Sequence, residues 1–283
     1  MKSSRVLVCL LFLLSLTAAR VWGDDAEAAY SQGQTLLTAG DLRGALKSYV
    51  QAVKLDRNNQ QYMQQYRLAR RALELQDKLS KQTDPKQWEA DALALRSFFN
   101  TQGLTQLALP LDQQLFEKAP TEDNAITLAE TYLSLDRGAE AVQALNKLPE
   151  AKLGPAGLAM LAIALARQGE REKAIAVAEG LKDLPATTDA GTLYLLARMQ
   201  AALGKTEESV ATLTACLAAV PPSRQDLLKS HARLCRDFTD VAATSGFTQA
   251  LATQSKVAES KCSGGSSCST CPMRGACEHD QAK

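Results

Sequence analysis

The chain has little of what most enzymes and nucleic-acid-binding proteins use. It holds two histidines in 283 residues, and aromatic residues make up 5%. Its 32 basic and 31 acidic residues leave a net charge of +1, without the basic excess typical of nucleic-acid binding. No phosphate-binding loop or paired-carboxylate constellation stands out. We therefore expect neither a nucleic-acid partner, nor a resident cofactor, nor an enzyme.

One histidine has a cysteine four residues later, and the two are candidates for a catalytic pair. The spacing places His231 and Cys235 on one face of a helix, and a Cys–His nucleophile pair needs that proximity. No third residue or oxyanion signature accompanies them. We predict instead that Cys235 is packed or disulfide-bonded, with Cys216 as its natural partner.

Long hydrophobic runs are also scarce, and the one that exists lies at the N-terminus. Lys2 and Arg5 precede the apolar run VLVCLLFLLSLTAA, and small residues follow near Gly23. This layout is typical of a cleavable secretory signal, and about 14 apolar residues are too few to span a bilayer. We predict a signal peptide over 1–23, export to the periplasm or the cell exterior, and a soluble mature protein without a membrane partner.

The remaining chain is rich in Ala, Leu, Gln and Glu, which favours helix almost throughout. Apolar residues recur every three or four positions, and turn signals interrupt them at short intervals. Segments along the chain share a frame: a small residue, a turn residue seven positions later, another small residue five further on, and then two packing positions. Four copies read Gly33, Gly40, Ala45, Tyr49 and Ala52; Ala129, Asp136, Ala141, Leu145 and Leu148; Ala162, Gly169, Ala174, Ala178 and Leu181; and Ala197, Gly204, Ser209, Leu213 and Cys216.

This frame resembles the tetratricopeptide repeat, a helix-turn-helix unit of 34 residues. The resemblance implies an all-α, right-handed solenoid of helical hairpins over 24–222, with the best copies near 26–59, 122–154, 155–188 and 190–222. Residues 60–120 fit poorly and read as one or two degenerate copies, with Asp84 as a helix N-cap and Pro110 as a kink or first-turn position. Residues 223–259 are predicted to cap the solenoid with a helix near 223–243 and another near 246–259.

The resemblance also implies a function. First helices of such repeats line a concave groove that binds peptides or protein segments, so we expect a protein or peptide partner. The lysines and asparagines with which chaperone-binding members hold a peptide carboxylate are absent. Their positions hold Tyr30 and Gln34, or Tyr194 and Arg198. The groove candidates are Glu27, Tyr30, Gln34, Glu130, Tyr194 and Arg198, with an apolar patch at Ala159, Ile163 and Ala166.

The last segment, 260–283, is a cysteine-rich tail with no apolar periodicity, and we predict that it is disordered. Disulfides are the leading prediction in an oxidising compartment, and the candidates across the chain are Cys216, Cys235, Cys262, Cys268, Cys271 and Cys277. Zinc is the alternative, because a C-x2-C pair is half of a common zinc site. Its ligands would be Cys262, Cys268, Cys271 and Cys277, with His279 as a substitute. A metal-handling or thiol-redox accessory protein is thus the rival to a binding scaffold.

Overall fold

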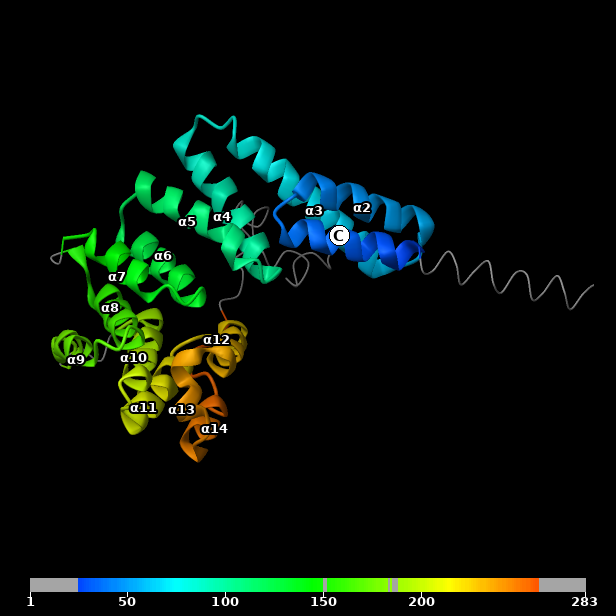
Figure 1. Cartoon of the computed structure of the whole chain (residues 1–283). Coiled ribbons are helices and arrows are strands. Elements are labelled where there is room, and N and C mark those ends of the chain that lie inside the picture. The colour runs from blue at the N-terminus through cyan, green and yellow to red at the C-terminus, as the bar shows by residue number, and fades with distance from the viewer. Residues whose placement is uncertain (1–24, 150–151, 183, 185–187, 260–283) are drawn as a thin grey trace, which may run out of the picture. The chain divides into compact units, whose positions relative to one another are not determined.

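A computed structural model describes residues 25–149, 152–182, 184 and 188–259. The predicted signal peptide and the cysteine-rich tail lie outside these residues. Every regular element in the described ranges is helical (Figure 1). The all-helical, stacked-hairpin architecture is therefore confirmed. No helix in the described part of the chain is both long enough and apolar enough to cross a membrane.

The chain divides into two compact units, 1–136 and 137–283. The first begins with a helix over 25–38, which is followed by helices that each pack against the next. Asp84 caps α4 by accepting from two backbone amides, as predicted, and Asn59 caps α3 in the same way. Thr121 caps α6 by accepting from one backbone amide, that of Asn124. The helices are α2 (Leu42–Leu55), α3 (Gln60–Leu79), α4 (Pro85–Thr101), α5 (Thr105–Lys118) and α6 (Glu122–Ser134).

The stretch that fits the repeat frame poorly forms the regular helices α3, α4 and α5. Gly103 joins α4 to α5 with φ +70°, so these two helices close a hairpin like those of the clearer copies. Pro110 lies inside α5, beyond its first turn. Of the two alternatives predicted for this proline, the first-turn position is wrong.

The second unit continues the hairpins and then adds a compact end. Helices α8 and α9, and α10 and α11, pack as pairs, while α8 also packs against α10 and α11 against α14. The elements are α7 (Gly138–Asn146), α8 (Pro155–Arg167), α9 (Arg171–Glu179), α10 (Ala190–Ala202), α11 (Thr206–Ala218), α12 (Pro222–Leu234), η2 (Arg236–Phe238), α13 (Thr239–Ala242) and α14 (Ser245–Leu251).

The end of this unit differs from the two helices predicted for 223–259. The first helix stops at Cys235, whose ψ of 122° is extended, and the second is only seven residues long. The break turns the chain inward, so that Phe238 and Val241 reach the core with at most 1% of their surface exposed. Burial of these apolar side chains outweighs the helical tendency of the segment.

The repeat frame marks real turns and close helix crossings. Its four turn residues all have positive φ: 84° at Gly40, 57° at Asp136, 82° at Gly169 and 76° at Gly204. The small residues that open the second helices, Ala45, Ala141, Ala174 and Ser209, have no exposed surface. In the last copy the Ser209 hydroxyl donates to the Ala197 carbonyl at 2.8 Å, which joins the two small positions of that hairpin.

Candidate protein-binding surface

The first hairpin and α3 contain a cluster of three tyrosines. Tyr30 is 4% exposed, and its ring stacks on that of Tyr62 at 4.8 Å between centroids and lies 5.7 Å from that of Tyr49. Tyr30 was predicted to face a groove. It is instead a core residue, because two aromatic rings cover it.

The hydroxyl of Tyr30 orients two exposed carboxamides. It accepts from Gln34 Nε2 at 3.1 Å and from Gln61 Nε2 at 3.0 Å. Nearby, the Tyr62 hydroxyl donates to Glu27 Oε2 at 2.7 Å, and this hydrogen bond, with burial, raises the pKa of Tyr62 to about 12. The exposed side chains Glu27, Gln34 and Gln61 are called the amide strip below. Sequence reasoning missed Gln61, although it stands 34 residues after Glu27, one repeat length later.

Glu130 is half-buried on α6 and does not belong to this strip. The next position, Thr131, belongs to a buried polar group that sequence reasoning missed. The Thr131 hydroxyl donates to Asp112 Oδ2 at 2.5 Å, and Arg96 forms an ion pair with Asp112 Oδ1. Burial raises the pKa of Asp112, outweighing the hydrogen bond from Thr131 and the charge of Arg96. This group ties α4, α5 and α6 together inside the first unit.

In the second unit the predicted groove residues hold the end of the chain's own fold. Tyr194 is 6% exposed and its hydroxyl lies 2.6 Å from His231 Nδ1. Arg198 is 4% exposed and donates from Nε to Asp237 Oδ2 at 2.9 Å. Both predictions of groove exposure are therefore wrong, because α12 and the η2 segment that follows it pack against these side chains. The patch residues Ala159 and Ile163 are fully buried, and Ala166 is half-buried.

Asp237 has a second arginine partner, Arg167, whose Nη2 lies 2.7 Å from Oδ1. Burial alone would raise the pKa of Asp237, but the charges and hydrogen bonds of Arg198 and Arg167 hold that pKa below its usual value. Two guanidinium groups thus stabilise this carboxylate, whereas Asp112 has one. The arrangement anchors η2 against α8 and α10 of the second unit.

The cysteines at 216 and 235 are free thiols in the structure. Cys216 Sγ donates to the Ala190 carbonyl at 3.2 Å, and Cys235 Sγ donates to Asp237 Oδ2 at 3.5 Å. Because the sulfur atoms face different partners, the predicted bond between them is not formed. Burial raises the pKa of Cys235, and that of Cys216 to about 11, which is the opposite of an activated nucleophile.

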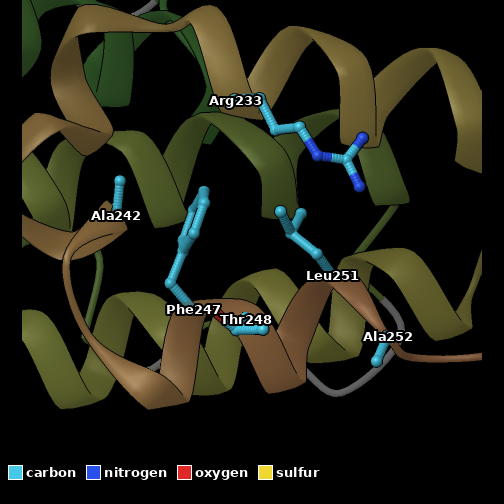
Figure 2. A pocket seen from close by; sticks show the side chains of 6 residues that line it. All are labelled: Arg233, Ala242, Phe247, Thr248, Leu251 and Ala252. Carbon is cyan, nitrogen blue, oxygen red and sulfur yellow. The ribbon is translucent and has the colours of Figure 1, made fainter.

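Among the described residues, no group of three or more His, Cys, Asp and Glu side chains could hold a metal ion. The zinc ligands proposed for the tail, and its disulfide candidates, lie outside the described part of the chain. Each unit has a surface cavity among its described residues. One, of about 740 Å³, is lined by residues within 57–68. The other, of about 440 Å³, lies between α12 and α14 (Figure 2).

Consecutive helical hairpins with tight positive-φ turns define a helical repeat protein. Residues 26–59, which comprise most of the first hairpin and the loop into α3, match the tetratricopeptide repeat family model. The match falls on the copy whose frame is most complete in sequence.

Two solved structures are similar at low identity. One is a tetratricopeptide repeat protein from Parabacteroides merdae ATCC 43184, at 16% identity over 81% of this chain and 98% of that chain, with a TM-score of 0.39. The other is the TPR2AB-domain:pHSP90 complex of yeast Sti1, at 15% identity over 81% of this chain and 99% of that chain, with a TM-score of 0.25. At these scores neither bears on function. No curated protein matches the chain.

Proposed function

We propose that the protein is an exported, non-catalytic scaffold that binds a peptide or protein segment along the amide strip of its first unit. The observation that carries this proposal is the pair of exposed carboxamides, Gln34 and Gln61, fixed on the hydroxyl of buried Tyr30. They project from the part of the chain where the tetratricopeptide match lies or directly follows it.

The chemistry of this strip suits an extended polypeptide. A carboxamide carries two N–H donors and an acceptor oxygen, which complement the N–H and C=O groups of a peptide backbone. Gln34 and Gln61 each donate one hydrogen bond to Tyr30. The second N–H and the carbonyl oxygen of each carboxamide can bind a ligand. Because Tyr30 already restrains both side chains, binding costs less conformational entropy than it would with free glutamines.

The second unit supports a different role. Its corresponding side chains, Tyr194 and Arg198, are engaged by His231 and Asp237. Helix α12 and the segment after it therefore serve as a cap that covers the last hairpin, in the way that terminal repeats of solenoids protect their apolar surface. In this proposal the contacts with a partner come from the first unit.

Site-specific photocrosslinking in the native cell tests the binding surface. A photoreactive residue at Gln34 or Gln61 is expected to capture one and the same partner. The control position is Lys47, which is exposed on α2 of the same hairpin. Equal capture from Lys47, or different proteins from Gln34 and Gln61, would remove the amide strip from the proposal.

Export is proposed from the N-terminal sequence, where Lys2 and Arg5 precede a single apolar run. Edman or mass-spectrometric sequencing of protein from its native compartment is expected to find Asp24 as the first residue. Protein that starts at Met1 would sink this part of the proposal while leaving the binding surface untouched.

A second candidate function is carried by the spacing of Cys262, Cys268, Cys271 and Cys277. In that case the tail handles a soft metal or exchanges disulfides, and the repeats dock it. Elemental analysis with free-thiol counting separates the candidates. One equivalent of zinc per chain favours the metal-handling function, whereas zero free tail thiols without metal favours disulfides and the scaffold.

A further inference from the structure

The cavity between α12 and α14 has an apolar floor. Phe247 and Leu251 rise from α14 toward α12, and Ala242 of α13 closes one end (Figure 2). Phe247 is 4% exposed, and its ring packs against Phe238 at 5.6 Å between centroids, so the floor is continuous with the core of the second unit. The volume of about 440 Å³ lies within the range of small-molecule sites, roughly 300–1,000 Å³.

Hydrogen bonds hold the walls of this cavity in place without a ligand. Lys229 of α12 donates from Nζ to the carbonyl of Thr253, just after α14, at 2.9 Å. The same ammonium donates to Gln225 Oε1 at 2.9 Å, and Gln225 Nε2 donates to the Leu217 carbonyl at 2.8 Å. The helix above the cavity is thus tied both to the segment below it and to α11. A rigid wall of this kind lowers the cost of binding.

Arg233 is the charged group of the cavity. It extends from α12 above Leu251 (Figure 2), and its side chain is exposed. Among the residues that the structure describes, it has no hydrogen-bond or ion-pair partner, in contrast to Arg167 and Arg198, which share Asp237. The Thr248 side chain, an exposed hydroxyl, also lines the cavity. A cation and a hydroxyl therefore border an apolar floor, with no acidic side chain among the lining residues.

We propose that this cavity binds a monocarboxylate with an aliphatic chain. The carboxylate would form a two-point hydrogen-bonded ion pair with the Arg233 guanidinium, the geometry that arginine favours. The aliphatic chain would cover Phe247 and Leu251 and remove their remaining apolar surface from water. Charge complementarity selects the anion, and the apolar floor selects against small hydrophilic anions. The site is independent of the amide strip and goes beyond the scaffold function.

Titration of hexanoate into the full-length, 15N-labelled protein tests the proposal by NMR. Saturable shifts are expected at Arg233, Thr248 and Leu251, with a Kd on the order of 1 mM or tighter for so small a ligand. Hexanamide, which has the same chain and no charge, should bind at least about tenfold more weakly. Acetate should show no saturable shift at these residues. Equal binding of hexanoate and hexanamide, or absence of saturable shifts with hexanoate, would overturn the proposal.

Two surface variants and a control make the test specific. Arg233→Gln removes the cation, and Thr248→Glu adds a carboxylate. Each should weaken hexanoate binding by about tenfold or more. Arg224→Gln removes an exposed arginine from the same helix outside the cavity and should leave the Kd unchanged. An unaltered Kd in Arg233→Gln, or an equal loss in Arg224→Gln, would contradict the assignment.

The carboxylate can be a free acid or the C-terminus of a peptide that ends in an aliphatic residue. A titration with N-acetyl-Ala-Leu and its C-terminal amide distinguishes these sources. Tighter binding of the dipeptide acid than of hexanoate assigns the site to peptide termini, and weaker binding assigns it to free acids. Either result supports the site, while equal binding of the dipeptide acid and its amide contradicts the role of the carboxylate.

Discussion

Arg96 of α4 and Asp112 of α5 form an ion pair across their hairpin, and Asp112 is fully buried. The two residues are sixteen positions apart, as are Gly33 and Tyr49, which meet across the first hairpin. The α4/α5 hairpin thus has an ion pair at the two positions where the first hairpin has a contact between a small and a large residue. Thr131 of α6 completes the group by donating to the same carboxylate.

Removal of Arg96 should destabilise the first unit. Arg96→Met leaves a buried carboxylate with Thr131 as its remaining partner, and we expect a loss of about 3 kcal/mol at pH 7. The pKa of Asp112 is raised by burial, so the stability linked to its protonation is present at low pH and is lost as pH rises through the folded-state pKa. The loss in Arg96→Met should therefore shrink at pH 4. Urea unfolding at both pH values measures it.

The double variant Arg96→Met/Asp112→Leu is the control for this account. Replacing both charges by apolar groups is expected to leave the free energy of unfolding within about 1 kcal/mol of the parent, or to raise it. A double variant as unstable as Arg96→Met would show that the ion pair itself, and not an isolated buried charge, decides the stability.

Asp237 should respond to pH in the opposite direction. Its folded-state pKa is lowered by Arg198 and Arg167 against the effect of burial. Its contribution is therefore complete above the unfolded-state pKa of about 3.9 and is lost as pH falls through the folded-state pKa. Asp237→Asn should lower the free energy of unfolding of the second unit by about 3 kcal/mol at pH 7. It should also make that free energy less dependent on pH between about 5 and 2. Unchanged acid sensitivity would exclude Asp237 as its source.

The positive-φ turns predict a matched pair of glycine substitutions. Gly169 has φ +82° and no atom within 4 Å of an added Cβ, so Gly169→Ala tests backbone strain alone and should cost about 1 kcal/mol. Gly180 lies nearby with φ −66°, where alanine fits, so Gly180→Ala should leave stability unchanged or raise it by about 0.5 kcal/mol. Thermal unfolding of both variants gives the comparison, and equal effects would contradict the role of φ at the turn.

The contact between Gly33 and Tyr49 predicts a steric effect. A Cβ at residue 33 would lie 2.6 Å from Tyr49 Cε1, and the ring is fully buried. Gly33→Ala should destabilise the first unit by about 2 kcal/mol through overpacking. Gly33→Ala/Tyr49→Leu should recover part of this loss, because the α8/α9 and α10/α11 hairpins pair alanine with smaller side chains at these positions. Chemical denaturation of both variants, without any recovery in the double, would argue against the clash.

The two described cysteines should react slowly. Burial raises the pKa of Cys216 from 9.0 to about 11, so alkylation at pH 8 should be roughly 100-fold slower than in unfolded protein because the thiolate is the reactive form. Peptide mapping after timed iodoacetamide treatment measures the rate at each cysteine. A Cys216–Cys235 disulfide in protein purified without reductant would contradict the free-thiol arrangement.

The hairpin frame could be predicted from sequence because it depends on local requirements. A turn with positive φ favours glycine, and a close helix crossing favours small residues, so Gly40, Gly169 and Gly204 marked the turns. The end of the second unit could not be predicted in the same way. The break at Cys235 depends on long-range burial of Phe238 and on the arginine partners of Asp237, which have no local signature.

The candidate site shows the same division. Its helices and the positions of Glu27 and Gln34 followed from the repeat frame. The burial of Tyr30, Tyr194 and Arg198 did not, because it depends on what the next helix or segment places over each side chain. Gln61 became part of the surface only through its hydrogen bond to Tyr30, a contact 31 residues apart in the chain.

The central claim is that the amide strip binds a polypeptide, and one affinity measurement tests it most directly. Calorimetry compares the parent, Gln34→Ala/Gln61→Ala and Lys47→Ala for binding the partner captured by crosslinking. We predict that the double alanine variant raises Kd about tenfold or more, since it removes two restrained hydrogen-bonding groups, and that Lys47→Ala leaves Kd unchanged. An unchanged Kd in a correctly folded Gln34→Ala/Gln61→Ala variant would contradict the claim.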